Sequence, residues 1–268
     1  MLDSQLSALR PLDVRASSFW DVQAFGCVRS TNEVVKAAMR EGASEGFCAT
    51  ALQQSGGYGR QGRTWVSPQG GLYTSFALRP NLPVAELPTL SLVVSLACAD
   101  ALEQVQPGLH PLIKWPNDVL CAEGKLVGIS LEALAGGVCV GVGMNLFRPQ
   151  LAQSVSGKYR QAYVFEGVAE SGLSVEQRVK ATRALELMLQ EVERRYAVWR
   201  SEGFAAFYGE YSRRFAYRGK RATLSSVDGA TCIEGTIEGV DAQGRILVND
   251  GGNVVPMASG EVHITALG

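Results

Sequence analysis

The spacing of apolar residues changes character near residue 217, and this change limits the folds open to the chain. Before it, segments with helical spacing such as residues 90–105 alternate with short apolar strands. After it come only short strands and turns, at residues 221–225, 231–240, 244–248, 253–257 and 262–265. The sequence therefore predicts an α+β domain over residues 1–215 and a small β-barrel over residues 216–268.

Capping signals mark two helices in the larger domain. Ser30-Thr31-Asn32-Glu33 predicts a capping box for a helix that ends at Gly42. Ser174 and Gln177 predict a second box, which opens a long helix. The apolar face expected for that helix is Val175, Val179, Leu185, Leu189, Val192, Tyr196 and Trp199.

A hairpin is expected next to these helices, within a mixed β-sheet. Residues 125–134 and 138–144 have the pattern of an antiparallel pair joined by a glycine turn. We expect strand 138–144 at an edge, where it is open to pairing across a two-fold axis. A homodimer is therefore left open.

Composition excludes several classes of protein. The 268 residues contain 25 Lys and Arg against 26 Asp and Glu, which argues against a broadly basic nucleic-acid coat protein. No apolar run reaches the ~18–20 residues that span a bilayer, and no signal-peptide pattern opens the chain. Residues 1–18 are too short for a helix-turn-helix domain. We expect a cytoplasmic protein that binds neither membrane nor DNA.

Histidine and cysteine are poorly placed for chemistry. The chain has two histidines, and its six cysteines are scattered without a CxxC pair. A zinc cluster is therefore hard to assemble, and no GxSxG motif points to a serine hydrolase. The chemistry is expected to rest on Lys, Arg, Asp and Asn.

The segment from Gln53 to Pro80 is rich in glycine and contains Arg60, Arg63 and Arg79. No acidic residue occurs between positions 46 and 85. Exposed amide N–H groups and unopposed guanidinium groups suit a phosphate or another anion, although a plain solvent-exposed loop has the same composition. A P-loop is excluded, because the proline and glycines at positions 68, 70 and 71 forbid the helix that must follow it.

Two further motifs carry polar residues at strand ends. Lys114, Asn117 and Asp118 surround Pro116, with Lys125 on the next strand, and this set suits Mg²⁺-phosphate chemistry or forms a salt-linked turn. The run from Gly141 to Asn145 lacks the third glycine and the helix of a dinucleotide fold. Its glycines allow close strand packing or the approach of a nucleotide.

Taken together, these motifs resemble the biotin–protein ligase family. STNE at 30–33, QSGGYGRQGRTWVSPQGGLY at 54–73, KWPNDVL with KLVG at 114–128, and GVGMN at 141–145 occur in the family's order and rough spacing. The resemblance covers roughly residues 19–215 and implies a class II synthetase-like fold, with an SH3-like barrel at the C-terminus. It implies the form of the family without an N-terminal DNA-binding domain.

The resemblance also implies residue roles. Lys125 and Arg60 match catalytic positions, and Asp118 matches the metal side, with Mg²⁺ as its ion. Tyr58 stands where the family usually has Arg, so only a role of that residue's main chain carries over. Positions implied to bind biotin are Ser30, Thr31, Asn32, Gln54, Tyr58, Gly59, Arg60 and Lys125, and positions implied to bind ATP are Arg60, Arg63, Trp65, Lys114, Asn117 and Asn145.

The implied reaction has two steps. Biotin and ATP give biotinyl-5′-AMP and pyrophosphate, and the biotinyl group then passes to a lysine of a biotin carboxyl carrier protein domain. The glycine-rich loop is expected to be mobile when empty and to fold over the adenylate. The alternatives are a ligase for lipoate or octanoate, a biotin-responsive repressor and a non-catalytic biotin-binding module.

Overall fold

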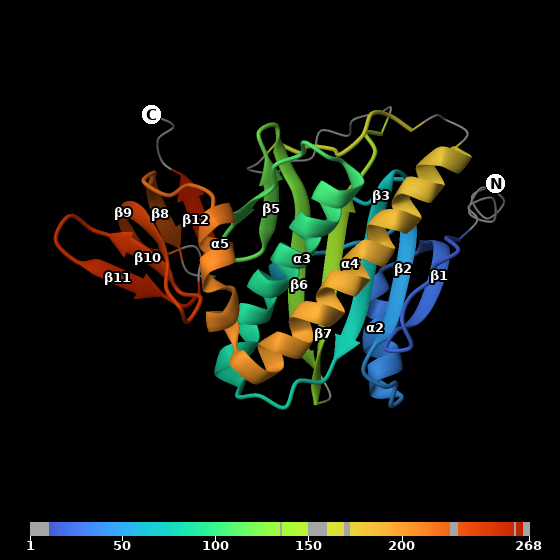
Figure 1. The fold of residues 1–268 in the computed structure, drawn as a ribbon, viewed down its shortest axis with the longest axis horizontal. Helices are drawn as coiled ribbons and strands as arrows, with labels where there is room; N and C mark the ends of the chain where they lie inside the picture. The colour runs from blue at the N-terminus through green and yellow to red at the C-terminus, as the bar shows by residue number, and fades with distance from the viewer. Residues whose placement is uncertain are drawn as a thin grey trace.

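The computed structural model describes residues 11–134, 136–149, 160–168, 172–225, 230–259 and 261–264. Its centre is a seven-stranded sheet of order β1-β2-β3-β7-β6-β5-β4 (Figure 1). β1 pairs with β2 in parallel and the other neighbours are antiparallel, which confirms the mixed sheet. The strands are β1 Asp21–Val28, β2 Phe47–Gln54, β3 Gly71–Leu78, β4 Leu112–Lys114, β5 Asp118–Cys121, β6 Gly124–Leu134 and β7 Gly137–Asn145.

Helices cover both faces of this sheet. α3 (Leu90–Val105) and α4 (Val175–Glu202) pack on each other over one face, and α2 (Thr31–Arg40) lies on the other, against β2, β3 and β7 (Figure 1). α5 (Tyr208–Arg214) follows a 3-10 turn at Phe204–Phe207 and leads to the C-terminal strands.

The sequence of β7 explains why its two faces differ. Side chains alternate across a strand, so Val138, Val140, Val142 and Met144 share the face that packs into the main core beneath α3 and α4. The opposite face carries small residues, among them Gly141 and Gly143. The sheet face on the α2 side therefore carries small residues at its centre, and the polar motifs gather above them.

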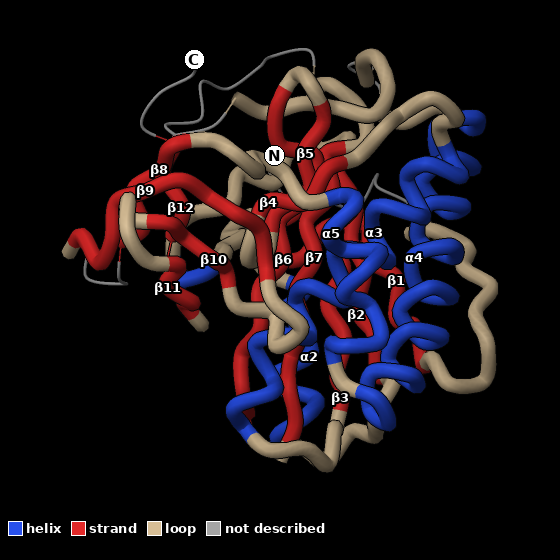
Figure 2. Tube along the Cα trace, turned by 60° about the vertical axis from the view of Figure 1, so that its left-hand side comes forward, coloured by secondary structure: helices blue, strands red, loops and turns tan. Residues whose placement is uncertain are grey.

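The C-terminal strands form a separate antiparallel sheet of order β11-β10-β9-β8-β12 (Figure 2). They correspond closely to the strands predicted from the sequence, although position 265 of the last predicted strand lies outside the described residues. The pairings between the described strands leave β11 and β12 as the two edges, so a closed barrel is not formed by these pairings. The strands are β8 Arg221–Ser225, β9 Thr231–Val240, β10 Ile246–Asn249, β11 Val254–Met257 and β12 Glu261–Ile264.

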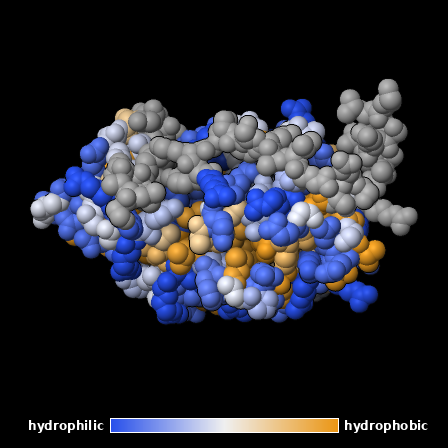
Figure 3. Space-filling view, turned by 90° about the horizontal axis from the view of Figure 1, so that it is seen from above, coloured by the Kyte–Doolittle hydropathy of each residue, from blue (hydrophilic) through white to orange (hydrophobic). Residues whose placement is uncertain are grey.

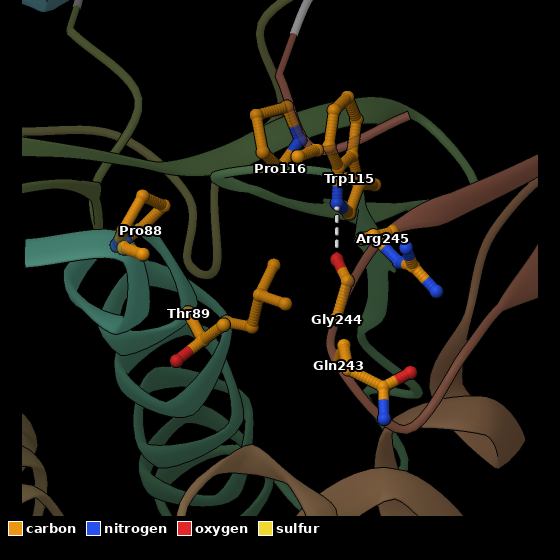
Figure 4. A pocket seen from close by; sticks show the side chains of 10 residues that line it. Pro88, Thr89, Trp115, Pro116, Gln243, Gly244 and Arg245 are labelled. Carbon is orange, nitrogen blue, oxygen red and sulfur yellow. Dashed lines mark hydrogen bonds between the residues drawn. The ribbon is translucent and has the colours of Figure 1, made fainter. Parts of the chain in front are cut away.

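A buried tryptophan joins the two sheets. Trp115 Nε1 donates a hydrogen bond of 3.0 Å to the carbonyl oxygen of Gly244, in the turn before β10 (Figure 4). Gly244 also packs tightly against Leu92 and Thr89 of the α3 region, where a side chain would not fit. The turn before β10 is therefore docked against the segment that carries Asn117 and Asp118.

A buried ionic cluster ties α3, α4 and α5 together. Arg195 of α4 is 2% exposed and donates hydrogen bonds to Asp100 of α3 and Glu210 of α5. Arg214 contacts Asp100 and Glu103 at 2.7 Å each. Burial opposes charge on Glu210, but the hydrogen bond and charge of Arg195 outweigh it and lower the pKa of that carboxyl group.

Several predictions about elements need correction. Ser30 is the N-cap of α2, but its side chain makes no capping hydrogen bond, so the predicted first capping box is wrong. The second box is confirmed, because Ser174 and Gln177 hydrogen-bond reciprocally. Val175 and Val179, expected on the apolar face, are exposed instead. They lie in the first turns of α4. On the face seen from above, hydrophobic and hydrophilic groups are mixed (Figure 3).

The expectation that β7 is an edge strand is wrong. β7 lies between β3 and β6 and is hydrogen-bonded on both sides, so it has no free edge for a second copy. β5 was not predicted, because its four residues follow the Pro116 turn too closely to be separated from it. The edges of this sheet are β1 and β4.

Among the described residues, one helical stretch, Val84–Val105, is long and apolar enough to cross a membrane by length and composition, although polar residues such as Asp100 and Glu103 interrupt its apolar run. Most of it is buried inside the protein, where α3 packs on α4 and on β6. These contacts are those of a core helix in a folded domain.

Candidate functional site

A chain of hydrogen bonds organises the N-terminus of α2. Gln54 Oε1 accepts from the main-chain N–H of Thr31 at 2.8 Å, so a side chain from β2 does what Ser30 was predicted to do. Thr31 Oγ1 lies 2.7 Å from Ser75 Oγ, which donates to Asn32 Oδ1 at 2.6 Å. Because an amide oxygen only accepts, the Ser75 proton is used there, and the one proton of the Thr31 hydroxyl is shared between Ser75 Oγ and Gln54 Oε1, which lies 3.2 Å from it. Ser30, Thr31 and Asn32 are all under 5% exposed.

The amide of Asn32 is fixed on both sides. Its Nδ2 donates to Glu132 Oε1 at 3.2 Å and to Ser130 Oγ at 3.4 Å, both on β6. A Cβ at Gly141 would lie 2.3 Å from Asn32 Oδ1, so only glycine fits beneath it. Both donor protons of Asn32 are used, and its remaining capacity is as an acceptor.

The glycine-rich loop, residues 53–71, folds back over this end of the sheet. Tyr58 and Thr64 form an isolated antiparallel bridge, and Gly59 N–H donates to the Arg63 carbonyl at 2.8 Å. Gln54 Nε2 donates to Ser67 Oγ at 2.9 Å, which closes the base of the loop. Gly57 lies so close to Ser67 and Gln54 that a Cβ would clash with both.

Trp65 covers two glycines of the sheet. Gly128 and Gly143 pair across β6 and β7, and a Cβ at either would lie 2.6–2.8 Å from the indole. Lys125 Nζ is 5.0 Å from the centroid of the same ring. Only the lack of side chains at positions 128 and 143 lets the ring rest on the strands.

Two lysines converge on Asp118. Lys125 Nζ is 2.7 Å from Asp118 Oδ1, and Lys114 Nζ is 3.7 Å from Oδ2. The carboxylate is 9% exposed, so these contacts lie in a partly desolvated region where electrostatic effects are stronger than in water. The β4–β5 hairpin places Lys114 directly opposite Asp118.

Arg60 reaches the same region from the glycine-rich loop. Its Nη1 donates to Asn117 Oδ1 at 3.0 Å. Asn117 Nδ2 donates to the Ile129 carbonyl at 2.8 Å, which fixes the amide so that its oxygen faces Arg60. Arg63, by contrast, is exposed, and its Nε contacts the Arg60 carbonyl at 3.4 Å.

Main-chain pairing holds Lys125 and Asn145 in place. Lys125 N–H donates to the Arg160 carbonyl at 2.9 Å, and Ala162 N–H donates back to the Lys125 carbonyl at 3.0 Å. Asn145 Nδ2 donates to that same carbonyl at 3.0 Å. Asn145 therefore supports the start of β6.

The strand register arranges these groups in two adjacent rows. One row crosses the sheet through Ser130, Gly141 and Ser75, beneath Asn32. The next row runs through Lys114, Asp118, Gly128 and Gly143, beneath Trp65. The rows are two residues apart along β6 and β7, about 7 Å. The site thus has a neutral hydrogen-bonding end and a cationic end.

Asp118 does not fit a magnesium ligand. Each of its oxygens faces a lysine, and a metal ion would have to displace Lys125. Across the described residues, no group of three or more His, Cys, Asp and Glu side chains could hold a metal ion. The geometry indicates that Asp118 is a counter-ion for the lysines.

Most of the implied residues gather on this face of the sheet, and the binding roles implied for Gln54, Asn145 and Arg63 stay predictions. In the structure Gln54 and Asn145 also hydrogen-bond to neighbouring main chain, and Arg63 is exposed. Sequence reasoning did not find Lys36, Ser67, Ser75, Ser130 and Glu132. Polar residues inside otherwise apolar strands were the available signal for Ser75 and Ser130.

Comparison with known proteins agrees with this geometry. Residues 24–146 match the Biotin/lipoate A/B protein ligase family. The chain is 33% identical over 238 residues to a biotin–[acetyl-CoA-carboxylase] ligase of Paracoccus denitrificans, covering 85% of this chain and 95% of that protein. It is 27% identical to the bifunctional ligase/repressor BirA of Escherichia coli, covering 88% of this chain and 72% of that protein.

A solved structure shares the fold over nearly its whole length. The biotin protein ligase of Aquifex aeolicus in complex with biotin and ATP superposes with a TM-score of 0.71 at 25% identity. The match covers 92% of this chain and 98% of that chain. It therefore includes the C-terminal strands as well as the seven-stranded sheet.

Proposed function

Because the chain belongs to the biotin–[acetyl-CoA-carboxylase] ligase family, we propose that it activates biotin with ATP and transfers the biotinyl group to a carrier-protein lysine. The observation that carries the proposal is the pairing of a neutral hydrogen-bonding row with a cationic row about 7 Å away. Biotin has the same division, with a ureido ring at one end and a carboxylate at the other.

The neutral end suits a ureido ring. Asn32 Oδ1 and Thr31 Oγ1 have acceptor capacity left, which the two ureido N–H groups match. The Ser30 hydroxyl is not used for capping and serves as a donor to the ureido carbonyl. Lipoate and octanoate have no such group, and they would leave this remaining hydrogen-bonding capacity unused. Ser30, Thr31 and Asn32 are therefore the residues that we propose to bind the ureido ring.

The cationic end supports adenylate formation. A biotin carboxylate oxygen attacks the α-phosphorus of ATP, the bond to the bridging oxygen breaks, and pyrophosphate leaves. Two anions must approach, so Lys125 and Arg60 act by neutralising charge and holding the two groups in line. Lys114 and Asn117 face the same region, Gly59 contributes main chain to the loop, and Trp65 offers an aromatic surface for the base. Asn145 acts indirectly, through the main chain of Lys125.

The second step needs no nucleophile from the enzyme. The acceptor ε-amine attacks the acyl carbon of biotinyl-5′-AMP, and AMP leaves. Burial raises the pKa of the Cys139 thiol to about 12 and raises those of Cys48 and Cys98 further, so these thiols stay protonated at neutral pH. A direct transfer from the mixed anhydride to the amine follows.

Some expectations stay predictions. Residues 1–215 acting as the catalytic unit, residues 216–268 as a separate domain, the lack of DNA binding and the cytoplasmic location rest on the sequence alone. Magnesium is expected to accompany the triphosphate, but Asp118 does not fit as its ligand, and no step is assigned to it.

The test is biotin transfer to a carrier domain. Purified protein, biotin and ATP are incubated with an isolated carboxyl carrier domain, and attached biotin is detected by streptavidin and located by mass spectrometry. The proposal predicts one biotinylated lysine, dependent on ATP. Failure to label the domain, while an authentic biotin ligase labels it under the same conditions, would contradict it.

A further inference from the structure

A lysine of α2 bridges the glycine-rich loop and the sheet. Lys36 Nζ is 2.7 Å from Glu132 Oε2 on β6 and 5.1 Å from the centroid of the Tyr58 ring in the loop. The Lys36 side chain is only 18% exposed. Burial would lower the pKa of Lys36, but Glu132 and Tyr58 outweigh burial and raise it, so the ammonium group is fully charged at neutral pH.

The same carboxylate reaches the ureido end of the site. Glu132 Oε2 faces Lys36, whereas Oε1 accepts from Asn32 Nδ2 at 3.2 Å. Asn32 Oδ1 is thereby turned toward Ser75 and the open side of the site. The position of the loop and the orientation of Asn32 are thus linked through one side chain.

Tyr58 connects this pair to the rest of the loop. It forms the bridge with Thr64, one residue before Trp65, and Trp65 N–H donates to the Gly57 carbonyl at 2.9 Å. Holding the Tyr58 ring therefore holds both arms of the hairpin that carries Arg60. The Tyr58 hydroxyl is buried, and it lies close enough to Lys36 and Glu132 for both side chains to affect its pKa.

We propose that Lys36, Tyr58 and Glu132 form a loop anchor that holds the glycine-rich loop over the site. The three are positioning residues: Tyr58 acts by placing its ring on the Lys36 ammonium, and Glu132 acts by orienting Lys36 and Asn32. The expected effect of the anchor on catalysis rests on the proposed function, whereas its expected effect on the position of the loop does not.

The anchor gives Tyr58 a side-chain role that differs from that of an arginine at this position. An aromatic face attracts the Lys36 cation, and the effect is larger where water is partly excluded. A guanidinium group there would instead place a second positive charge beside Lys36. The mobility of the empty loop stays a prediction, and this contact is the one that we expect to stabilise the loop in its folded-over position.

Trypsin cleavage of the ligand-free protein tests the anchor without any assay of activity. Arg60 and Arg63 are the cleavage sites inside the loop. We expect Lys36→Met and Tyr58→Ala to raise the initial cleavage rate at these sites about tenfold, which corresponds to ~1.4 kcal/mol. Tyr58→Phe keeps the ring and loses only the hydroxyl, so its rate is expected within about twofold of the parent.

A matched control is available in α4. Lys180 Nζ lies 5.0 Å over the Phe165 ring and 2.8 Å from Glu176, so it has the same pair of contacts outside the loop. Lys180→Met is expected to leave cleavage at Arg60 and Arg63 unchanged. Equal cleavage rates in the parent, Lys36→Met and Tyr58→Ala would overturn the anchor.

A second readout follows the adenylate. With biotin and ATP but no acceptor, release of AMP reports loss of biotinyl-5′-AMP to water. We expect this release, per molecule of adenylate formed, to be about tenfold faster in Lys36→Met and Tyr58→Ala than in Tyr58→Phe. Glu132→Gln is expected to raise the KM for biotin more than the KM for ATP, through Asn32. If Tyr58→Phe behaves as Tyr58→Ala does, the hydroxyl and not the ring acts, and the proposal fails.

The two readouts separate this inference from the proposed function. If Lys36→Met and Tyr58→Ala are cleaved tenfold faster than the parent, but the parent forms no biotin-dependent AMP, the anchor is supported and the proposed ligase activity is contradicted. If the two variants are cleaved at the parent rate, and the parent does form biotin-dependent AMP, only the anchor is contradicted.

Discussion

Lys125 Nζ lies 2.7 Å from Asp118 Oδ1, and this contact fixes the position of the cation that we propose acts in adenylate formation. Asp118 also holds Lys114, so one carboxylate orients two positive charges toward the same side of the sheet. A negatively charged ligand that reaches this point competes with Asp118 for the lysines. The carboxylate thus keeps the lysines in place and is not itself a reacting group.

Replacing Lys125 by Met should remove most of the adenylation activity. Loss of one preorganised donor in such a site costs ~2.7–4 kcal/mol, or about 100- to 1000-fold in rate. The fold should persist, because Lys114 still neutralises Asp118. Biotin-dependent exchange of pyrophosphate into ATP measures the effect, with Lys180→Met as the control. Exchange near the parent rate would remove Lys125 from the mechanism.

Alanine substitutions at two neighbouring glycines should change the KM values for different substrates. A Cβ at Gly141 would meet Asn32 Oδ1 at 2.3 Å, and one at Gly143 would meet Trp65 Nε1 at 2.6 Å. We expect Gly141→Ala to raise the KM for biotin and Gly143→Ala to raise the KM for ATP, each about tenfold, because crowding of this kind costs ~1–3 kcal/mol.

Steady-state kinetics of the alanine variants check this division. Neither Gly141 nor Gly143 has a positive φ, so the added methyl group alone is tested. A Cβ at Gly209 of α5 would meet no atom closer than 3.8 Å, so Gly209→Ala serves as the control. Equal effects of Gly141→Ala and Gly143→Ala on both KM values would contradict the two-row site.

The junction between the two sheets should contribute to stability. Trp115→Phe leaves the Gly244 carbonyl without its hydrogen bond and is expected to cost ~1–3 kcal/mol of unfolding free energy. Trp20 is similarly buried, but its Nε1 has no hydrogen-bond partner among the described residues, so Trp20→Phe isolates the loss of ring volume. Urea unfolding measures the free energy of unfolding of both variants. If Trp115→Phe loses no more stability than Trp20→Phe does, the hydrogen bond to Gly244 adds nothing.

Acid should weaken the ionic cluster between α4 and α5. The pKa of Glu210 is lowered in the folded state, so its contribution is complete above the ordinary value near 4.5 and disappears as pH falls through the folded pKa. Glu210→Gln is expected to cost about 1–2 kcal/mol at pH 7, allowing for partial exposure, and progressively less toward pH 3.

Urea unfolding from pH 3 to pH 7 measures this dependence. Glu176→Gln removes a carboxylate that also has a lowered pKa but is fully exposed, and no measurable change in stability is expected from it. A difference between Glu210→Gln and the parent that stays constant across this range would contradict the linkage.

Local patterns were enough to predict most of the fold. Alternation and apolar spacing predicted β6, β7, α3 and the C-terminal strands, because each depends on which residues face the core. The order of the strands was beyond this reasoning. The edge position predicted for β7 is wrong because no local signal shows that residues 71–78, far along the chain, pair with it.

The site was predicted in its main parts for a different reason. Lys114, Asn117, Asp118 and Lys125 were found because they are close in sequence and come together in one hairpin region. Lys36 and Glu132 are 96 positions apart, and each taken alone has the pattern of a surface charge. At the N-terminus of α2, Gln54 accepts a hydrogen bond from the helix in place of the predicted Ser30 cap. Composition could not show this, because it depends on how β2 is placed beside that helix.

Pyrophosphate exchange with purified protein tests the central claim most directly, when biotin, lipoate and octanoate are compared at equal concentration with ATP. The account predicts exchange that requires biotin, with lipoate and octanoate at background, because they lack the ureido group that the buried polar row matches. Exchange supported by lipoate or octanoate and not by biotin would contradict it.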